Sequence, residues 1–137
     1  MHHSHGFSLL EILVVLAIVS ILTRLCLPLY SQHLVTERRL EAIITLEKLA
    51  AALENYYTVH NTYQGTNLEK LGFSSLIAKN NYQLTITTLS DNMFSLAATP
   101  LTHQAQQDNS CGTLALDATG KKSITGNGQI SDCWGYG

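Results

Sequence analysis

The sequence predicts an α+β protein in which one long N-terminal helix precedes a small antiparallel sheet. From Phe7 to Leu29 almost every side chain is apolar, and about 20 helical residues of this kind are enough to cross a bilayer. From residue 82 onward the pattern changes to an alternation of apolar and polar residues, which is typical of strands with one buried face. We therefore expect an apolar helical rod joined to a compact domain.

The composition fits one modest domain and disfavours a general nucleic-acid surface. The 137 residues include 8 Lys and Arg against 10 Asp and Glu, for a net charge of -2, whereas nucleic-acid surfaces are normally clearly basic. Between Phe7 and Val35 the only Asp, Glu, Lys or Arg residues are Glu11 and Arg24. An ionisable group at membrane depth is functional by default, so Glu11 requires a partner.

The three cysteines divide into a pair and a singleton. Cys111 and Cys133 lie in the polar part of the chain, and Cys26 lies in the apolar run. This division suggests one disulfide in an oxidising compartment and one thiol that packs as a small apolar side chain. The spacing of Cys and His residues does not match a zinc site, and we expect neither a metal nor a cofactor.

The N-terminus resembles the class III signal of type IV pilins and related pseudopilins. A secretory signal would place its cleavage site after the apolar run, whereas here Gly6 comes before it. The stretch Gly6-Phe7-Ser8-Leu9-Leu10-Glu11, the long apolar helix, Pro28 and Tyr30 together carry the resemblance. It implies that prepilin peptidase, an inner-membrane aspartyl protease, cuts between Gly6 and Phe7 and N-methylates Phe7. It also implies a helix kink at Pro28.

The same resemblance implies a partner for Glu11. In the family, the matching acidic residue pairs with the N-terminal amine of a neighbouring subunit, here that of Phe7. A new α-amino group has a reference pKa of about 7.7–8.0 and is cationic near neutral pH. Removing one member of a charge pair in a low-dielectric setting strands the other charge, so we expect Glu11 and Phe7 to direct subunit assembly.

Two features depart from the family pattern. The leader carries His2, His3 and His5 but no Lys or Arg. These histidines permit a metal-site interpretation, although a short discarded leader is favoured. Arg24 lies in a stretch that is normally uncharged in the family. It either snorkels toward periplasmic headgroups, which we favour, or meets a carboxylate of a neighbouring subunit.

The helix is expected to continue past the apolar run, from about Phe7 to about Tyr57, or roughly 75 Å at 1.5 Å per residue. Apolar residues recur at spacings of three and four, apart from one seven-residue step that spans Arg39. This stripe, which we expect to pack on a domain, consists of Val35, Ala42, Leu46, Leu49, Leu53 and Tyr56.

The rest of the chain predicts a loop and then a sheet. We expect a loop over 58–81, with a single helical turn near Leu68–Gly72, and three or four antiparallel strands within 82–126. The strands are expected at 82–87, 94–98, 114–116 and near 123–125. Such a sheet would pack on the second half of the helix.

The C-terminal region is similar to that of the PilE-like minor pilins. The similarity rests on Thr99-Pro100, Cys111-Gly112-Thr113-Leu114 and Cys133-Trp134. It implies a disulfide loop over 111–133, which secretion pseudopilins usually lack, and closing such a loop contributes about 3 kcal/mol. The expected organisation is a cleaved leader (1–6), a transmembrane and filament-core helix half (7–33) and an exposed globular pilin domain (34–137).

The sequence shows no catalytic constellation, and we do not expect an enzyme. His60 and His103 are interpreted as exposed loop histidines. Turn capping is favoured over calcium binding for the short acids Asp108, Asp117 and Asp132, because EF-hand spacing is absent. Lys121-Lys122 is a basic doublet between the two cysteines of the polar domain; it is a weak candidate for contact with DNA phosphates, and a solvated turn is favoured.

The predicted function is that of a type IV pilus subunit, a minor pilin that helps prime pilus assembly or is incorporated in the filament. Adhesion, twitching motility and DNA uptake remain open as its task. A major pilin, a pilin receptor for DNA or a host surface, and a type II secretion pseudopilin are the alternatives, and the cysteine pair disfavours the last.

The resemblance also implies partners and a location. The partners are other pilin subunits, prepilin peptidase and the inner-membrane assembly machinery. The chain is expected first in the inner membrane as a single-pass protein with its N-terminus in the cytoplasm. It is then expected in the extracellular pilus of a Gram-negative bacterium.

Overall fold

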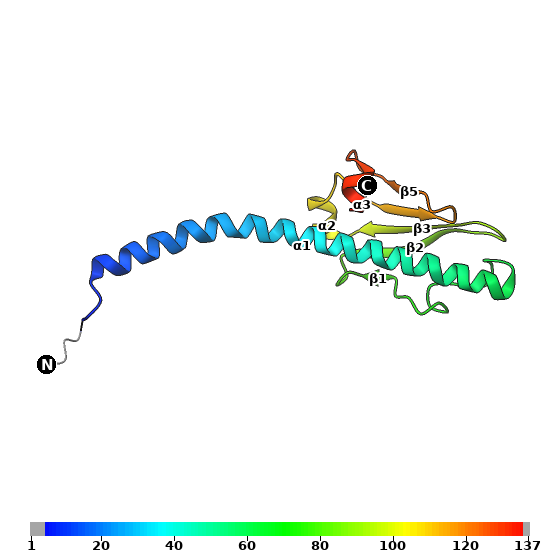
Figure 1. Ribbon diagram of the computed structural model, residues 1–137, viewed down its shortest axis with the longest axis horizontal. Coiled ribbons are helices and arrows are strands. Elements are labelled where there is room, and N and C mark those ends of the chain that lie inside the picture. The colour runs from blue at the N-terminus through cyan, green and yellow to red at the C-terminus, as the bar shows by residue number, and fades with distance from the viewer. Residues whose placement is uncertain (1–4, 136–137) are drawn as a thin grey trace. The chain divides into compact units, whose positions relative to one another are not determined.

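A computed structural model describes residues 5–135, and its first element is the helix α1, Leu9–His60, of 52 residues (Figure 1). The side-chain oxygen of Ser8 accepts a hydrogen bond from the amide of Leu10 at 3.3 Å, near the start of the helix. The helix ends at Asn61, whose φ of 58° lies in the left-handed region that terminates helices. The predicted long helix is therefore confirmed, with ends two and three residues later than expected.

The chain divides into two compact units, one ending at Leu34 and one beginning at Val35, and α1 contributes to both. In the first unit, every side chain from Phe7 to Tyr30 is exposed. The most apolar window of α1 has a mean hydropathy of 2.5, and α1 is long and apolar enough to cross a membrane. A helix that is apolar on all sides needs an apolar environment such as lipid or other helices.

The second unit contains an antiparallel sheet of five strands in the order β1-β2-β3-β4-β5. The strands are β1 (Leu76–Ile77), β2 (Tyr82–Leu89), β3 (Phe94–Pro100), β4 (Leu114–Asp117) and β5 (Lys122–Ile124). Consecutive strands are neighbours throughout, so the sheet is a meander. The alternating pattern predicted the four longer strands within two residues at each end.

The sheet differs from the prediction in its first strand. Leu76 and Ile77 pair with Gln83 and Tyr82, so part of the expected loop over 58–81 belongs to the sheet. A strand of two residues is too short to show alternation, which is why the sequence did not reveal it. Two short helices, α2 (Thr102–Gln107) and α3 (Ile130–Trp134), were also not predicted.

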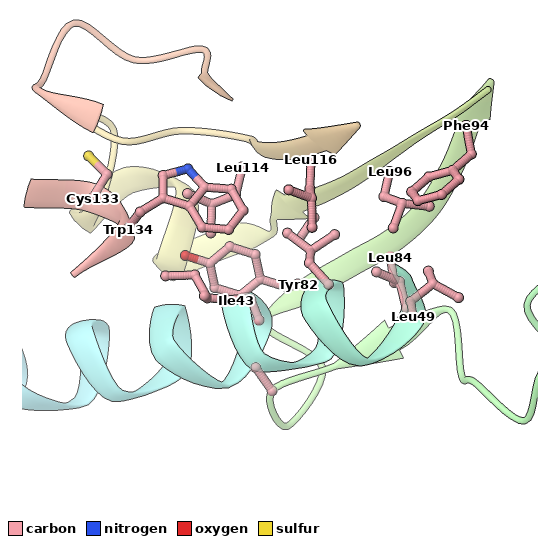
Figure 2. Close-up of a cluster of buried hydrophobic side chains, with 14 of the residues drawn as sticks. Ile43, Leu49, Tyr82, Leu84, Phe94, Leu96, Leu114, Leu116, Cys133 and Trp134 are labelled. Carbon is pink, nitrogen blue, oxygen red and sulfur yellow. The ribbon is translucent and has the colours of Figure 1, made fainter. Parts of the chain in front are cut away.

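The hydrophobic core lies between the second half of α1 and one face of the sheet (Figure 2). The predicted stripe of α1 supplies five fully or almost fully buried residues, while Tyr56 is only partly buried and Ile43 joins the core instead. The side chains of the core come from α1 (Ala42, Ile43, Leu46, Leu49, Leu53), from the strands (Tyr82, Leu84, Phe94, Leu96, Ala98, Leu114, Leu116) and from α3 (Cys133, Trp134).

The C-terminal segment completes this core and is held by the disulfide Cys111–Cys133, with a Cα–Cα distance of 5.5 Å. The predicted disulfide loop is thus confirmed. Trp134 is fully buried, and its indole Nε1–H donates to the carbonyl of Ser123 at 3.3 Å. The loop packs closely on itself, because a Cβ added to Gly126 would lie 2.1 Å from the carbonyl oxygen of Ser110.

Candidate functional site

The predicted cleavage site lies in the exposed, non-helical segment that precedes α1. Gly6 has no other heavy atom within 4 Å of a Cβ built on it, and Phe7 is 80% exposed. A protease needs an extended, accessible backbone at the bond that it cuts. The peptide bond between Gly6 and Phe7 is accessible, and its cleavage stays a prediction; His2 and His3 lie outside the described residues.

Glu11 lies in the first turn of α1, where the partial positive charge of the helix N-terminus favours a carboxylate. Together with Phe7, Ile12, Val15 and Leu16, it lines an almost wholly apolar hollow of about 270 Å³. The hollow places a negatively charged acceptor beside apolar side chains near the chain end that cleavage would create. This arrangement suits an amino group presented by a second apolar helix.

Arg24 follows Phe7 by 17 residues, which places its Cα about 25 Å further along the helix axis. It is exposed, as is the free thiol of Cys26. The nearby hydroxyls of Ser20 and Thr23 donate to the carbonyls of Ala17 and Val19 within the helix. Pro28 lies inside the continuous helix α1, and the kink there stays a prediction.

A buried polar cluster joins three elements of the second unit and was not predicted. Arg39 of α1 forms an ion pair with Asp108, just after α2, with 2.5 Å between Nη1 and Oδ1. Only 14% and 4% of these two side chains are exposed. The interpretation of Asp108 as a turn-capping acid is therefore wrong, because its carboxylate forms an ion pair with the Arg39 guanidinium.

Gln104 and Tyr82 complete this Arg39–Asp108 cluster. The amide nitrogen of Gln104 donates to the backbone carbonyl of Val35 and to the hydroxyl of Tyr82, both at 3.0 Å. The Tyr82 hydroxyl donates to Asp108 Oδ2 at 3.2 Å, and burial raises the pKa of Tyr82 well above its ordinary value. The sequence did contain one signal of this cluster, namely the seven-residue step in the apolar stripe at Arg39.

Lys121 and Lys122 do not form a single basic surface. Lys122 pairs with Leu116 across the strands, and its Nζ lies 3.8 Å from a Glu47 oxygen and 5.2 Å from the Trp134 ring centre. Lys121 is exposed at the β4–β5 turn. Of the doublet, Lys121 is therefore the more available to an external anion.

Short acids and histidines mostly serve local structure. Asp117 Oδ1 accepts hydrogen bonds from the Thr119 hydroxyl and from the amides of Thr119 and Lys121, and these bonds, that of the hydroxyl above all, lower the pKa of Asp117. It caps the β4–β5 turn as expected. His60 and His103 are exposed as predicted, but they lie in α1 and α2 rather than in loops. Among residues 5–135, no three His, Cys, Asp or Glu side chains gather as metal ligands would.

Comparison with solved structures places this fold. The structure is similar to the non-core minor pilin PilV of Neisseria meningitidis, with a TM-score of 0.53 over 74% of this chain and 97% of that chain. Identity between the two is 23%, so this likeness concerns the fold alone. The fold, with its long N-terminal helix, antiparallel sheet and C-terminal disulfide, is that of type IV pilins.

Sequence comparison narrows the class. The family model of the prokaryotic N-terminal methylation motif matches residues 1–23. A second family model matches residues 28–115 and is described as "Type IV minor pilin ComP, DNA uptake sequence receptor". Because the second match covers more than half of the chain, the chain belongs to this family of type IV minor pilins.

Curated relatives come from Neisseria. A fimbrial protein of Neisseria meningitidis serogroup B (strain ATCC BAA-335 / MC58) is 37% identical over 62 residues, or 45% of this chain and 36% of the relative. The type IV major pilin protein PilE of Neisseria gonorrhoeae is 34% identical over 77 residues, or 56% of this chain and 46% of the relative. The chain thus spans less than half the length of these relatives.

Proposed function

We propose that this chain is a minor subunit of a type IV pilus that is cut after Gly6, methylated at Phe7 and inserted into the filament through Glu11. The observation that carries the proposal is an exposed apolar helix with a single carboxylate in its first turn. Prepilin peptidase and the inner-membrane assembly machinery are the partners that this processing requires. The role is structural rather than catalytic.

The same helix segment lies in two environments, one before and one after assembly. Before assembly, the segment 7–33 spans the inner membrane with its N-terminus in the cytoplasm, and the globular domain 34–137 lies on the far side. After assembly, the helices of neighbouring pilin subunits replace lipid around this segment, in a filament outside a Gram-negative cell. Both environments are apolar around the segment from Phe7 to Tyr30, whose side chains are all exposed.

Glu11 positions the subunit axially when it moves from the membrane into the filament. Its carboxylate and the Phe7 amino group of an adjacent subunit form a charge pair in apolar surroundings. Loss of one partner leaves the other charge stranded at low dielectric, which costs about 3–5 kcal/mol for a buried pair. The pair therefore favours one axial position of an entering subunit over others.

The test is the change Glu11→Ala, followed by mass spectrometry of sheared pili and of the cell membrane. We expect cleavage and methylation at Phe7 to persist while the amount of this subunit in pili falls strongly. The matched control is Glu41→Ala, which removes an exposed carboxylate from the same helix outside the apolar segment. Normal incorporation of the Glu11→Ala subunit would contradict the assembly role. An abundance equal to that of the principal pilus protein would contradict the minor role.

DNA binding is the second candidate function, and it is favoured by the description of the matched family as a DNA uptake sequence receptor. Lys121, exposed within the disulfide loop, is the side chain that supports it here. Two observations argue against a broad positively charged surface for DNA. The net charge of the chain is -2, and Lys122 contacts Glu47. Binding would thus depend on few phosphate contacts.

The DNA test uses the full chain in lipid nanodiscs and double-stranded DNA fragments. We expect affinity to fall as salt rises, because each phosphate contact releases counterions. Lys121→Ala should weaken binding more than Lys122→Ala, and Lys48→Ala on α1 is the matched control. Binding that does not depend on salt, or that survives replacement of both lysines, would exclude this contact.

A further inference from the structure

A groove in the second unit lies between the segment 66–75 and the outer edge of β2. It has a volume of about 550 Å³ and is mainly apolar. Its walls are formed by Thr66, Asn67, Leu68, Glu69 and Ser75 on one side and by Gln83, Leu84, Thr85, Ile86 and Leu89 on the other. None of these residues belongs to the regions assigned above to assembly or to DNA contact.

The groove exists because β1 covers only the beginning of β2. β1 pairs with Tyr82 and Gln83, and the amide of Leu84 then donates to the carbonyl of Ser75 at 2.7 Å. At the other end, the amide of Tyr63 donates to the carbonyl of Asp91 at 3.2 Å. Between these two ties, the connecting segment leaves the strand edge uncovered.

The uncovered edge presents backbone groups to the groove. In an antiparallel pair, the backbone N–H and C=O groups of one residue point toward the partner strand, and those of the next residue point away from it. Leu84 faces away from β3, because its amide bonds to Ser75. Ile86, two residues on and before the register shift between Ile86 and Thr88, faces the same way. Its N–H and C=O therefore point into the groove.

We propose that this groove binds a short extended segment of a partner protein, which pairs with the free edge of β2 at Ile86. A polypeptide is the occupant whose own backbone complements an open strand edge, and apolar side chains at alternate positions would contact Leu68 and Leu89. The one charged side chain among the lining residues is Glu69, which favours a neutral or basic segment and disfavours a nucleic acid. The ties at Leu84 and Asp91 leave the six residues 85–90 between them, so the contact can extend over about 20 Å at 3.4 Å per residue.

The proposal is independent of the pilus function and is tested with the full chain in lipid nanodiscs. The probe is the synthetic peptide Lys-Val-Thr-Val-Thr-Val-Lys, which alternates apolar and polar residues between basic ends. We expect it to slow hydrogen–deuterium exchange in the segment 84–90 and to bind with measurable affinity by fluorescence polarisation. A peptide of the same sequence that is N-methylated at every internal residue lacks free internal amides on both of its edges, so it should not pair and should not protect the segment.

Ile86→Pro is the sharpest variant, because it removes the outward amide while sparing the bonds between β2 and β3, as proline does on an edge strand. Loss of this one hydrogen bond should lower the affinity about two- to twelvefold. Ile86→Val, which keeps the amide, is the control and should bind like the parent.

A second variant keeps the test informative if Ile86→Pro does not fold. Glu69→Lys should weaken binding of the basic probe, whereas Glu41→Lys, an equal change of charge on α1 outside the groove, should not. No protection of the segment 84–90 at saturating probe overturns the proposal. Equal binding of the N-methylated peptide, or equal protection by a DNA duplex, also overturns it.

Discussion

Arg39 and Asp108 show how one buried charge pair connects segments that are far apart in the sequence. Burying two charges is costly, and the pair offsets this cost only when further hydrogen bonds satisfy the remaining polar atoms. Tyr82 and Gln104 supply two such contacts to Asp108, at 3.2 and 3.4 Å. The cluster thereby ties α1 to β2 and to α2 at one end of the core.

The pair predicts strong non-additivity in stability. For the soluble fragment that begins at Leu34, Arg39→Leu or Asp108→Leu alone should lower the free energy of unfolding by about 3 kcal/mol, because each strands a buried charge. The double variant should lose less than the sum of the two single changes. Urea unfolding of all four proteins measures this coupling, and simple additivity would show that the pair is not coupled in solution.

Tyr63 predicts a dependence of stability on alkaline pH. Burial, together with the hydrogen bond to the Glu54 carboxylate at 2.9 Å, raises the pKa of Tyr63 from 10.0 to about 12. Below pH 10 the tyrosine is protonated in both the folded and the unfolded state. Between pH 10 and about 12 the unfolded state loses its proton first, so rising pH should favour unfolding.

The measurement is the urea midpoint of unfolding of the fragment from pH 8 to about pH 12. This pH range is chosen because it brackets the ordinary tyrosine pKa of about 10. Tyr63→Phe should show a smaller decline above pH 10 than the parent protein. Tyr56→Phe is the control, since Tyr56 is only partly buried and donates to the carbonyl of Gln64. An equal decline in the parent and in Tyr63→Phe would assign the effect to other groups.

At the level of elements, α1 combines two kinds of helix in one continuous segment. Up to Tyr30 all its side chains are exposed and mostly apolar, whereas from Val35 on it buries only one stripe. Both patterns are visible in the sequence, because composition reports the first and periodicity the second. For this reason α1 was predicted as one continuous element, with ends two and three residues from those observed.

Arg24 gives a prediction about the depth of α1 in a bilayer. Its Cα lies about 25 Å along the axis from Phe7, so its guanidinium can reach the headgroups at the far side of a hydrocarbon core of about 30 Å. A spin label on the free thiol of Cys26 should therefore report the headgroup region in lipid vesicles. Arg24→Leu should move the label deeper, while Ser20→Leu, one turn earlier, should not.

Two results would argue against this role of Arg24. A label on Cys26 that reports the bilayer centre in the parent protein would place the segment differently. An unchanged depth after Arg24→Leu would remove the guanidinium as the anchor. The second result would favour a carboxylate of a neighbouring subunit as the partner of Arg24.

For the molecule as a whole, the fold was predictable and much of the polar interior was not. Alternation along β2 and β3 and the turn residues between strands are local signals, so the meander could be read from the sequence. The Arg39–Asp108 pair joins residues 69 positions apart, and local periodicity carries no information on such a contact. The side chains of Lys121 and Lys122 differ in their surroundings although the residues are neighbours, because Lys121 is exposed at the β4–β5 turn while Lys122, the first residue of β5, lies near Glu47 and Trp134.

The proposed assembly site was likewise predictable only in part. Gly6, Phe7 and Glu11 form a compact motif that the sequence shows directly. The partner that we propose for Glu11 belongs to another subunit, so no pattern within one chain can reveal its position. The groove beside β2 was also hidden, because it results from the place where β1 ends and not from any motif.

The disulfide carries a prediction for the whole second unit. It links residues 22 positions apart, and closing a loop of that size should contribute about 3 kcal/mol. The variant Cys111→Ser/Cys133→Ser of the fragment from Leu34 should unfold at correspondingly lower urea. Reductant should lower the stability of the parent fragment by a similar amount and leave the variant unchanged. Equal stability of parent and variant would contradict a stabilising role.

The position of Trp134 in the chain also sets an order of events during synthesis. Its indole fills the core that α1, β2 and β3 form much earlier in the sequence, so those elements emerge from the ribosome with an uncovered apolar face (Figure 2). Cys111 likewise appears before its partner Cys133, at a time when Cys26 is the other thiol present in the nascent chain. Retention of Cys26 in the bilayer would keep that early thiol away from Cys111 until the native partner arrives.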